Sequence, residues 1–339
     1  MRKLFLSIVC LFLSQTIFAQ EWHSINTKSE ESYSTKLIKS TNESVVIDLS
    51  LNGFYTNHTS LPNSVIITNE DMAPLSEAGQ PNIPSLSIPI IINDMGKMDV
   101  RVSKVEYLEY NDIEIAPSKG EFPRSINPDD VPYTYGDVYQ QNEFFPATNV
   151  KLDSPYILRD FRAQNIIVTP FAYNPVTKTL RVMHKMTIEV VSTKEEGENE
   201  LARRSNTINM DSEFEKMYSN RFINYKESGA KYDIIEEEGD LLIICHDAFM
   251  SAMQPFVEWK RATGRKTTMV GTSVAGTSAD NIKNYISSQY EDNPNLVHVL
   301  LVGDYQQLPG KYLTMGSGYY DNYSGYSDWW FGQLEGNDR

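Results

Sequence analysis

The pattern of apolar residues along the chain changes near residue 240. Before about residue 193 the apolar segments are short, and most of the 16 prolines lie between them. After residue 240, continuous apolar runs alternate with segments of helical period. Alternating residues suit a sheet with one open face, whereas uninterrupted runs suit strands covered on both faces. The switch predicts a β-rich domain followed by the start of an α/β domain.

Residues 20–195 are predicted to form the β-rich, sandwich-like domain. In this part Val100, Val102 and Tyr107 approximate the alternation of a half-buried antiparallel strand. Prolines and turn residues separate the apolar segments, and none of them has the period of a helix. The candidate strands are 44–50, 87–92, 98–108, 165–171 and 179–191.

Residues 241–339 are predicted to begin an α/β domain. The run LLIIC at 241–245 is typical of a parallel strand buried on both faces. Apolar residues at helical spacing follow it twice, each time before another strand-like run, which gives a β-α-β-α-β order with right-handed crossovers. The expected elements after the first strand are a helix over 248–262, a strand at 266–270, a helix over 279–290 and a strand at 297–302.

Residues 196–240 are predicted to connect the two domains. The charged segment 194–206 is the best candidate for a domain boundary, a short helix is expected over 210–221, and 222–240 is expected to be an exposed linker. Three basic residues here are candidate processing points, although each taken alone is better explained as a solvated charge: Arg221, Lys226 and Lys231.

The N-terminus has the layout of a secretory signal peptide, predicted over residues 1–19. Arg2 and Lys3 precede an apolar stretch from Leu4 to Phe18. A membrane anchor is the alternative, but the stretch is short and polar residues interrupt it. We therefore expect a secreted or cell-surface protein without a stable membrane span.

Composition excludes several classes of function. The chain has 30 Lys and Arg against 45 Asp and Glu, a formal net charge of −15, and this acidic balance argues against nucleic-acid binding. The five histidines show no metal-ligand spacing. Two cysteines are too few for a disulfide framework, and signal removal leaves Cys245 alone.

The triplet Cys245-His246-Asp247 could be taken for a thiol nucleophile with its base. Adjacent strand residues point to opposite faces, however, so the thiol and the imidazole cannot easily share a proton. We interpret Cys245 as a buried apolar residue at the end of a strand. Two glycine-containing segments, 271–278 and 303–311, do not match the phosphate-binding loop pattern.

The segment 312–339 is rich in aromatic residues, interleaved with glycine and serine. This composition favours an exposed, shaped loop over a core helix, with its aromatic side chains covering the end of the sheet or stacking on a ligand. Its carboxylates could hold a structural calcium ion, although their spacing does not match a known calcium loop. The candidate calcium ligands are Asp321, Asp328, Glu335 and Asp338.

The segment from residue 241 on resembles the gingipain-type secreted cysteine peptidases, and the part before 240 resembles their propeptide. Ordered motifs carry the resemblance: PFVEWK at 255–260, LLVGD at 300–304 and EGND at 335–338 in the later part, with GQPNIP at 79–84 and FINY at 222–225 in the earlier part.

The resemblance implies a zymogen, in which a β-rich propeptide precedes a caspase-like three-layer α/β peptidase domain. In that chemistry a histidine accepts the thiol proton, the thiolate attacks the peptide carbonyl and backbone amides stabilise the oxyanion. The family's catalytic histidine and cysteine belong to later strands. No residue of this chain matches either position, Cys245 included, so we assign no catalytic, cofactor-binding or metal residue and expect an incomplete peptidase domain.

The sequence thus predicts the N-terminal part of a secreted cysteine endopeptidase precursor that acts on polypeptides, with a propeptide-to-peptidase contact and no activity of its own. The alternative is a secreted binding or relic protein that uses the β-rich domain and the aromatic C-terminal segment.

Overall fold

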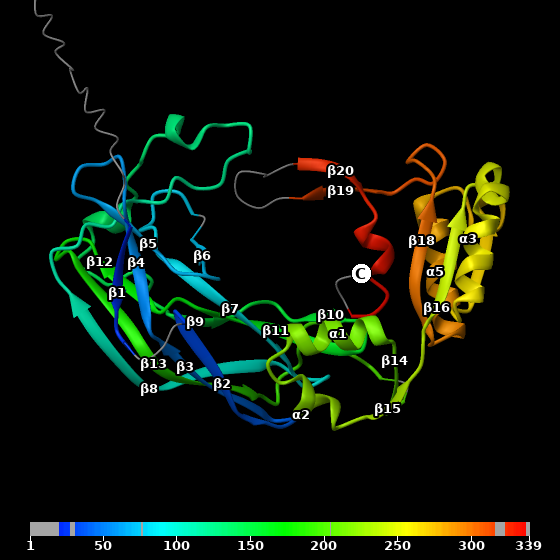
Figure 1. The fold of residues 1–339 in the computed structure, drawn as a ribbon, viewed down its shortest axis with the longest axis horizontal. Helices are drawn as coiled ribbons and strands as arrows, with labels where there is room; N and C mark the ends of the chain where they lie inside the picture. The colour runs from blue at the N-terminus through cyan, green and yellow to red at the C-terminus, as the bar shows by residue number, and fades with distance from the viewer. Residues whose placement is uncertain (1–19, 28–30, 76, 204, 316–322, 337–339) are drawn as a thin grey trace, which may run out of the picture.

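The computed structural model describes residues 20–336 except 28–30, 76, 204 and 316–322 (Figure 1). The expected signal peptide therefore lies outside the described residues. A β-rich lobe occupies one end of the molecule, and a smaller α/β lobe occupies the other (Figure 1). No helix among the residues described is long and apolar enough to cross a membrane.

The β-rich lobe contains three antiparallel sheets, with strand orders β1-β4-β5, β10-β11-β7-β6 and β12-β13-β3-β2. Strand β9 also pairs with β11, and β8 pairs with β13. The elements are β1 Gln20–Ser24, β2 Tyr33–Ser40, β3 Ser44–Leu51, β4 Gly53–His58, β5 Val65–Thr68, β6 Ala73–Pro74, β7 Pro84–Ile91, β8 Met98–Tyr110, η1 Pro128–Asp130, η2 Asp137–Gln140, β9 Val150–Leu152, β10 Tyr156–Leu158, β11 Phe161–Val168, β12 Phe171–Asn174 and β13 Thr179–Ser192.

The larger two sheets share one hydrophobic core, which confirms the sandwich-like domain. Strand β3 alternates buried and half-buried positions, so Val45, Ile47 and Leu49 all point inward. They pack in one cluster with Ile88 of β7 and Ile166 of β11 from the facing sheet. Each candidate strand of the sequence overlaps a strand of this lobe.

The connecting region is structured, in contrast to the exposed linker expected over 222–240. It contains β14 Thr207–Met210, α1 Ser212–Arg221, α2 Tyr225–Gly229 and β15 Asp233–Glu236. Phe222 and Tyr225 are buried against Phe161 of the β-rich lobe. The Asn224 amide is fully buried. It donates to the Ile91 carbonyl at 2.8 Å and accepts from the Ile91 N–H at 2.8 Å. The polar residues that suggested a linker lie on the outer side of these short elements.

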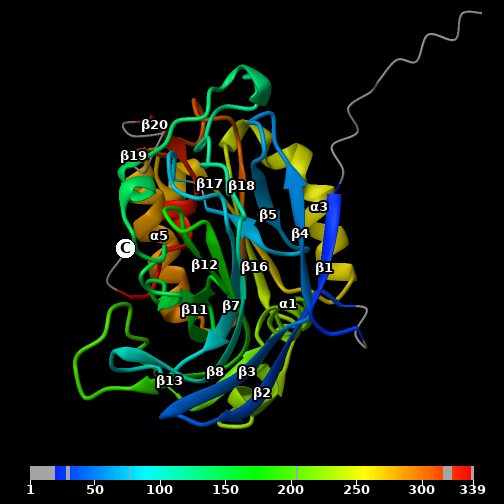
Figure 2. The same ribbon diagram turned by 90° about the vertical axis from the view of Figure 1, so that its left-hand side faces the viewer.

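The α/β lobe is a three-stranded parallel sheet of order β17-β16-β18 with a helix on each face (Figure 2). In β16, Leu242 and Ile244 pack toward α5, whereas Ile243 and Cys245 pack toward α3. The apolar run is therefore buried on both faces, as predicted. The elements are β16 Asp240–Cys245, η3 Asp247–Phe249, α3 Met250–Ala262, β17 Thr267–Gly271, α4 Thr272–Ala275, α5 Ala279–Asp292 and β18 Leu296–Val302.

The aromatic segment after residue 311 is not a loop throughout. It forms an antiparallel hairpin, β19 Lys311–Met315 and β20 Tyr323–Ser327, followed by the short helix η5 Trp329–Gly332. Phe331 is buried against α5. Tyr326 stacks on Tyr305 at the exposed surface, with 5.5 Å between ring centroids. Hairpin pairing and one buried aromatic anchor replace the expected loop.

Candidate functional site

The Cys245 thiol lies inside the α/β lobe and not in a cleft. Its side chain is fully buried, and its Sγ atom contacts the His246 backbone carbonyl at 3.3 Å. Burial, with a smaller effect of the Asp247 charge, raises the pKa of the thiol. The His246 ring faces the other way and accepts from the Ala248 N–H. The interpretation of Cys245 as a core residue is confirmed by its burial, since a nucleophile needs a lowered pKa and access to substrate.

Asp247 connects the carboxyl ends of two neighbouring strands of the parallel sheet, β16 and β17. Its carboxylate accepts from the Ser273 hydroxyl at 2.7 Å, the Ser273 N–H at 3.0 Å and the Thr272 hydroxyl at 3.0 Å. These hydrogen bonds, the Ser273 hydroxyl first, lower the pKa of Asp247. The carboxylate thus occupies the N-terminal end of α4, where a phosphate would have to bind. Segment 271–278 therefore uses an internal anion, consistent with its lack of the phosphate-loop pattern.

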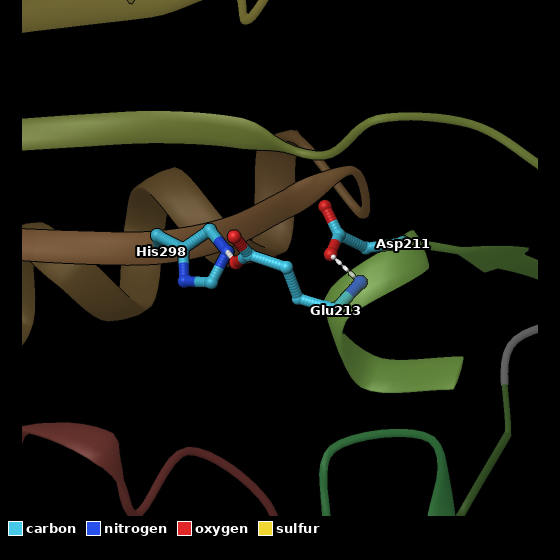
Figure 3. A group of neighbouring side chains, drawn as sticks. All are labelled: Asp211, Glu213 and His298. Carbon is cyan, nitrogen blue, oxygen red and sulfur yellow. Dashed lines mark hydrogen bonds and ion pairs between the residues drawn. The ribbon is translucent and has the colours of Figure 1, made fainter. Parts of the chain in front are cut away.

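A cluster of charged residues around the buried Asp211 joins the connecting region to the α/β lobe. We call it the Asp211 cluster: Asp211, Glu213, Glu238, Arg265 and His298. Asp211 and Glu213 come from the start of α1, and His298 comes from β18 (Figure 3). Glu238 and Arg265 come from the turns before β16 and β17. Glu238, Arg265 and His298 lie at least 25 positions after Glu213, so only the fold brings them to the start of α1.

Asp211 is fully buried and accepts hydrogen bonds from both sides of this contact. One carboxylate oxygen caps α1 by accepting from the Glu213 N–H at 2.9 Å. The other accepts from the Gly239 N–H at 3.0 Å and from Arg265 at 3.1 Å. Burial alone would raise the pKa of Asp211, but the two N–H donors and the Arg265 charge outweigh it and hold this pKa below its usual value.

The rest of the cluster surrounds Arg265. Its guanidinium lies 2.8 Å from the Glu238 carboxylate and 3.9 Å from that of Glu213. The His298 Nε2 atom lies 3.1 Å from Glu213 (Figure 3). Ligand atoms of Asp211, Glu213 and His298 all lie within 4.8 Å of one another. The donors already bound to Asp211 compete with a metal ion, so we place no metal here.

A backbone ladder extends the same contact. Strand β14 pairs with β15 in parallel, with Ile208 opposite Ile234. Beyond the strand ends, the Asp233 and Glu237 N–H groups donate to carbonyls of Asn206 and Met210, each at 3.1 Å. Next to the ladder, the Arg203 guanidinium stacks on Tyr232 at 4.2 Å, and the Tyr232 hydroxyl donates to Asp94 at 3.2 Å.

An apolar cavity of about 810 Å³ separates the lobes beside this contact. Tyr156 and Phe214 line it from the β-rich side, and Val299 lines it from strand β18. The candidate calcium ligands Asp328 and Glu335 also border it. Asp321 and Asp338 lie outside the described residues.

Sequence reasoning missed the Asp211 cluster. The aspartate directly before an amphipathic segment is a recognisable helix cap. Its cross-lobe partners Gly239 and Arg265 carry no such signal, because only the tertiary fold brings them to α1.

Comparison with known proteins places both parts of the chain in one family. A match to Propeptide_C25 covers residues 28–231, and a match to Peptidase family C25 covers residues 234–339. The two matches meet at the start of β15, inside the connecting region 196–240.

Curated relatives agree with these matches. Gingipain R1 of Porphyromonas gingivalis is 34% identical over 312 residues, which are 90% of this chain and 30% of that protein. Gingipain R2 of the same species (strain ATCC BAA-308 / W83) is 36% identical over 270 residues, which are 78% of this chain and 35% of that protein. The chain thus spans about a third of the length of these relatives.

A solved structure titled as the complex of Porphyromonas gingivalis RgpB pro- and mature domains is also similar. The match has a TM-score of 0.52 and 33% sequence identity, and it covers 57% of this chain and 97% of the solved chain. Together with the sandwich-like lobe and the parallel three-layer lobe, these matches lead to one conclusion. The chain belongs to the C25 family of gingipain-type cysteine peptidase precursors and carries the propeptide and the start of the peptidase domain.

Proposed function

We propose that this chain is the N-terminal part of the zymogen of a secreted cysteine endopeptidase that hydrolyses polypeptides. The observation that carries the proposal is the succession of a C25 propeptide at 28–231 and a C25 peptidase start at 234–339 in one chain. In the whole protein a Cys–His pair would supply the thiolate that attacks the peptide carbonyl, with backbone amides around the oxyanion.

Within that zymogen, the β-rich lobe acts as the propeptide and holds the first strands of the peptidase domain. The Asp211 cluster and the β14–β15 pairing support this role, because they connect residues on both sides of position 231. The 339-residue chain itself is proposed to be inactive, since its buried Cys245 has a raised pKa. Hydrolysis of a denatured protein substrate under reducing conditions tests the inactivity of this chain and the endopeptidase activity of the whole protein. The assay compares this chain with a longer product of the same gene.

Processing is proposed to occur after Lys231. Arg221 lies within α1 and Lys226 within α2, whereas Lys231 lies in the turn between α2 and β15. Lys231 is half-buried, so the cut requires this turn to open, which a turn does more readily than a helix. N-terminal sequencing of the mature enzyme should give Tyr232 as its first residue. Lys231→Gln should block that cut, whereas Lys226→Gln should leave it unchanged; a mature N-terminus at Phe222 or Glu227 would refute the assignment.

Secretion through the signal at 1–19 supports the extracellular placement. Mass spectrometry of the exported precursor should find Gln20 at its N-terminus. An intact Met1 on exported protein would contradict this part of the proposal.

A structural calcium ion remains a proposal for the C-terminal carboxylates, of which Asp328 and Glu335 flank η5. A ligand that binds only the folded state raises the unfolding temperature. Thermal unfolding in calcium and in excess chelator, with Asp328→Asn as the comparison, tests whether calcium binds here. Equal unfolding midpoints in both conditions would show that it does not.

The rival function, a secreted binding or relic protein, is not favoured, since it does not require a peptidase segment after the propeptide. The coding DNA downstream of codon 339 separates the two. An open frame with a His-Gly pair and a later cysteine supports the peptidase, and a stop codon supports the rival.

A further inference from the structure

We propose that Asp211 is the anchor that keeps the propeptide bound to the peptidase domain after the chain is cut at Lys231. This inference rests on the proposed zymogen function and adds to it the residue that controls propeptide release. A cut after Lys231 leaves Asp211 on the propeptide fragment and both of its cross-lobe donors, Gly239 and Arg265, on the peptidase fragment.

The Asp211 carboxylate is shielded from water within the folded contact. The Asp211 side chain is fully buried, and the Arg265 side chain is 12% exposed. Hydrogen bonds to an ionised group are stronger than those between neutral groups, which offsets the cost of keeping both charges out of water. Loss of the Asp211 charge would leave the Arg265 cation at this site without its buried anion, which should weaken the bound state.

Several other contacts cross the same cut, among them the Glu213–His298 pair and the stacking of Arg203 on Tyr232. The Ser212 hydroxyl donates to Glu238 at 2.8 Å, directly beside Asp211. Strand β15 would become the first strand of the mature enzyme and stays paired with β14 of the propeptide. The four residues of β15 are exposed, and Glu213 and Glu238 are mostly exposed as well. Asp211 is the one fully buried carboxylate among these described contacts, so we assign it the leading part in retention.

Asp211 has a second task that must be separated from this one, because it also caps α1. Asparagine is as good a helix cap as aspartate. Asp211→Asn therefore keeps the cap while it removes the negative charge that Arg265 pairs with. Asp48→Asn is the matched control: the Asp48 carboxylate accepts from the Thr187 hydroxyl at 2.6 Å, and both residues lie within the propeptide.

The experiment uses the full chain with a recognition sequence for an added site-specific protease placed between Lys231 and Tyr232. The chain is folded, nicked and analysed by size-exclusion chromatography, and the dissociation rate of the fragments is then measured with the propeptide fragment immobilised. We expect the parent and Asp48→Asn chains to elute as one species after nicking. Asp211→Asn should dissociate about 10- to 100-fold faster, while its far-ultraviolet circular dichroism before nicking matches the parent.

Equal dissociation rates for Asp211→Asn and the parent would overturn the anchor. So would separation of the parent fragments on the column. Because the added protease makes the cut, neither result depends on natural processing at Lys231 or on catalytic activity. Failure of the anchor is therefore distinguishable from failure of the zymogen proposal.

Discussion

The Arg265 guanidinium lies 3.1 Å from the buried Asp211 carboxylate and joins the turn before β17 to the start of α1. Arg265→Met removes this cation and leaves Asp211 buried with only its N–H donors. Breaking one side of a buried pair costs about 3 kcal/mol of unfolding free energy. Urea unfolding of the intact chain, followed by tryptophan fluorescence, measures the loss.

Lys97→Met provides the control for that variant. Lys97 pairs with Glu195 at 2.8 Å on the propeptide surface, and both side chains are mostly exposed. Such pairs contribute little, so its midpoint should stay near that of the parent. An Arg265→Met midpoint as close to the parent as that of Lys97→Met would show that the buried pair does not stabilise the contact.

Acid should weaken the same contact. The pKa of Asp211 is lower in the folded chain than its usual value of about 4. Its ionised form therefore stabilises the fold above about pH 4, and this stabilisation is lost as the pH falls toward the folded pKa. Asp211→Asn should be less stable than the parent at pH 6, and the difference should shrink at pH 3. A difference that is the same at both pH values would contradict the assignment.

The Asn224 side chain should be one of the most sensitive positions of the connecting region. It satisfies both backbone groups of Ile91 and donates to the Ser40 hydroxyl at 3.1 Å. Asn224→Ala leaves buried polar groups unpaired, which costs about 2 kcal/mol. Asn224→Asp keeps the acceptor for the Ile91 N–H and loses the donor, so chemical denaturation should place it below the parent as well. A parent-like midpoint for Asn224→Ala would mean that water replaces the amide.

Cys245 should be unreactive in the folded chain. Its thiol is buried and its pKa is raised, so little thiolate exists at neutral pH. In a Cys10→Ser background, a thiol reagent at pH 7.5 should label Cys245 only after denaturant is added. Rapid labelling of the native chain would place the thiol at an accessible site.

The α/β order was predictable because each of its signals is local. The run at 241–245 is apolar at every position, which only a strand covered on both faces explains, and both helices carry period-3.6 apolar residues. The antiparallel strands were predictable in position, but not in their pairing, which depends on contacts between distant segments.

The contact between the lobes was not predictable. Segment 222–240 is polar, yet Phe222, Asn224 and Tyr225 are buried, because the β-rich lobe offers them an apolar surface and the backbone groups of Ile91 at the end of β7. Arg265 looks like a solvated charge in the sequence, and only the fold gives it Asp211 as a partner. Tertiary context overrides composition in both places.

Peptide hydrolysis under reducing conditions distinguishes an inactive N-terminal part from an active peptidase. We expect the purified 339-residue chain to be inactive and Cys245→Ala to change nothing. A longer product of the same gene, once processed after Lys231, should cleave polypeptides and lose this activity to a thiol-alkylating reagent. Thiol-dependent hydrolysis by the 339-residue chain that Cys245→Ala abolishes would instead make Cys245 a nucleophile.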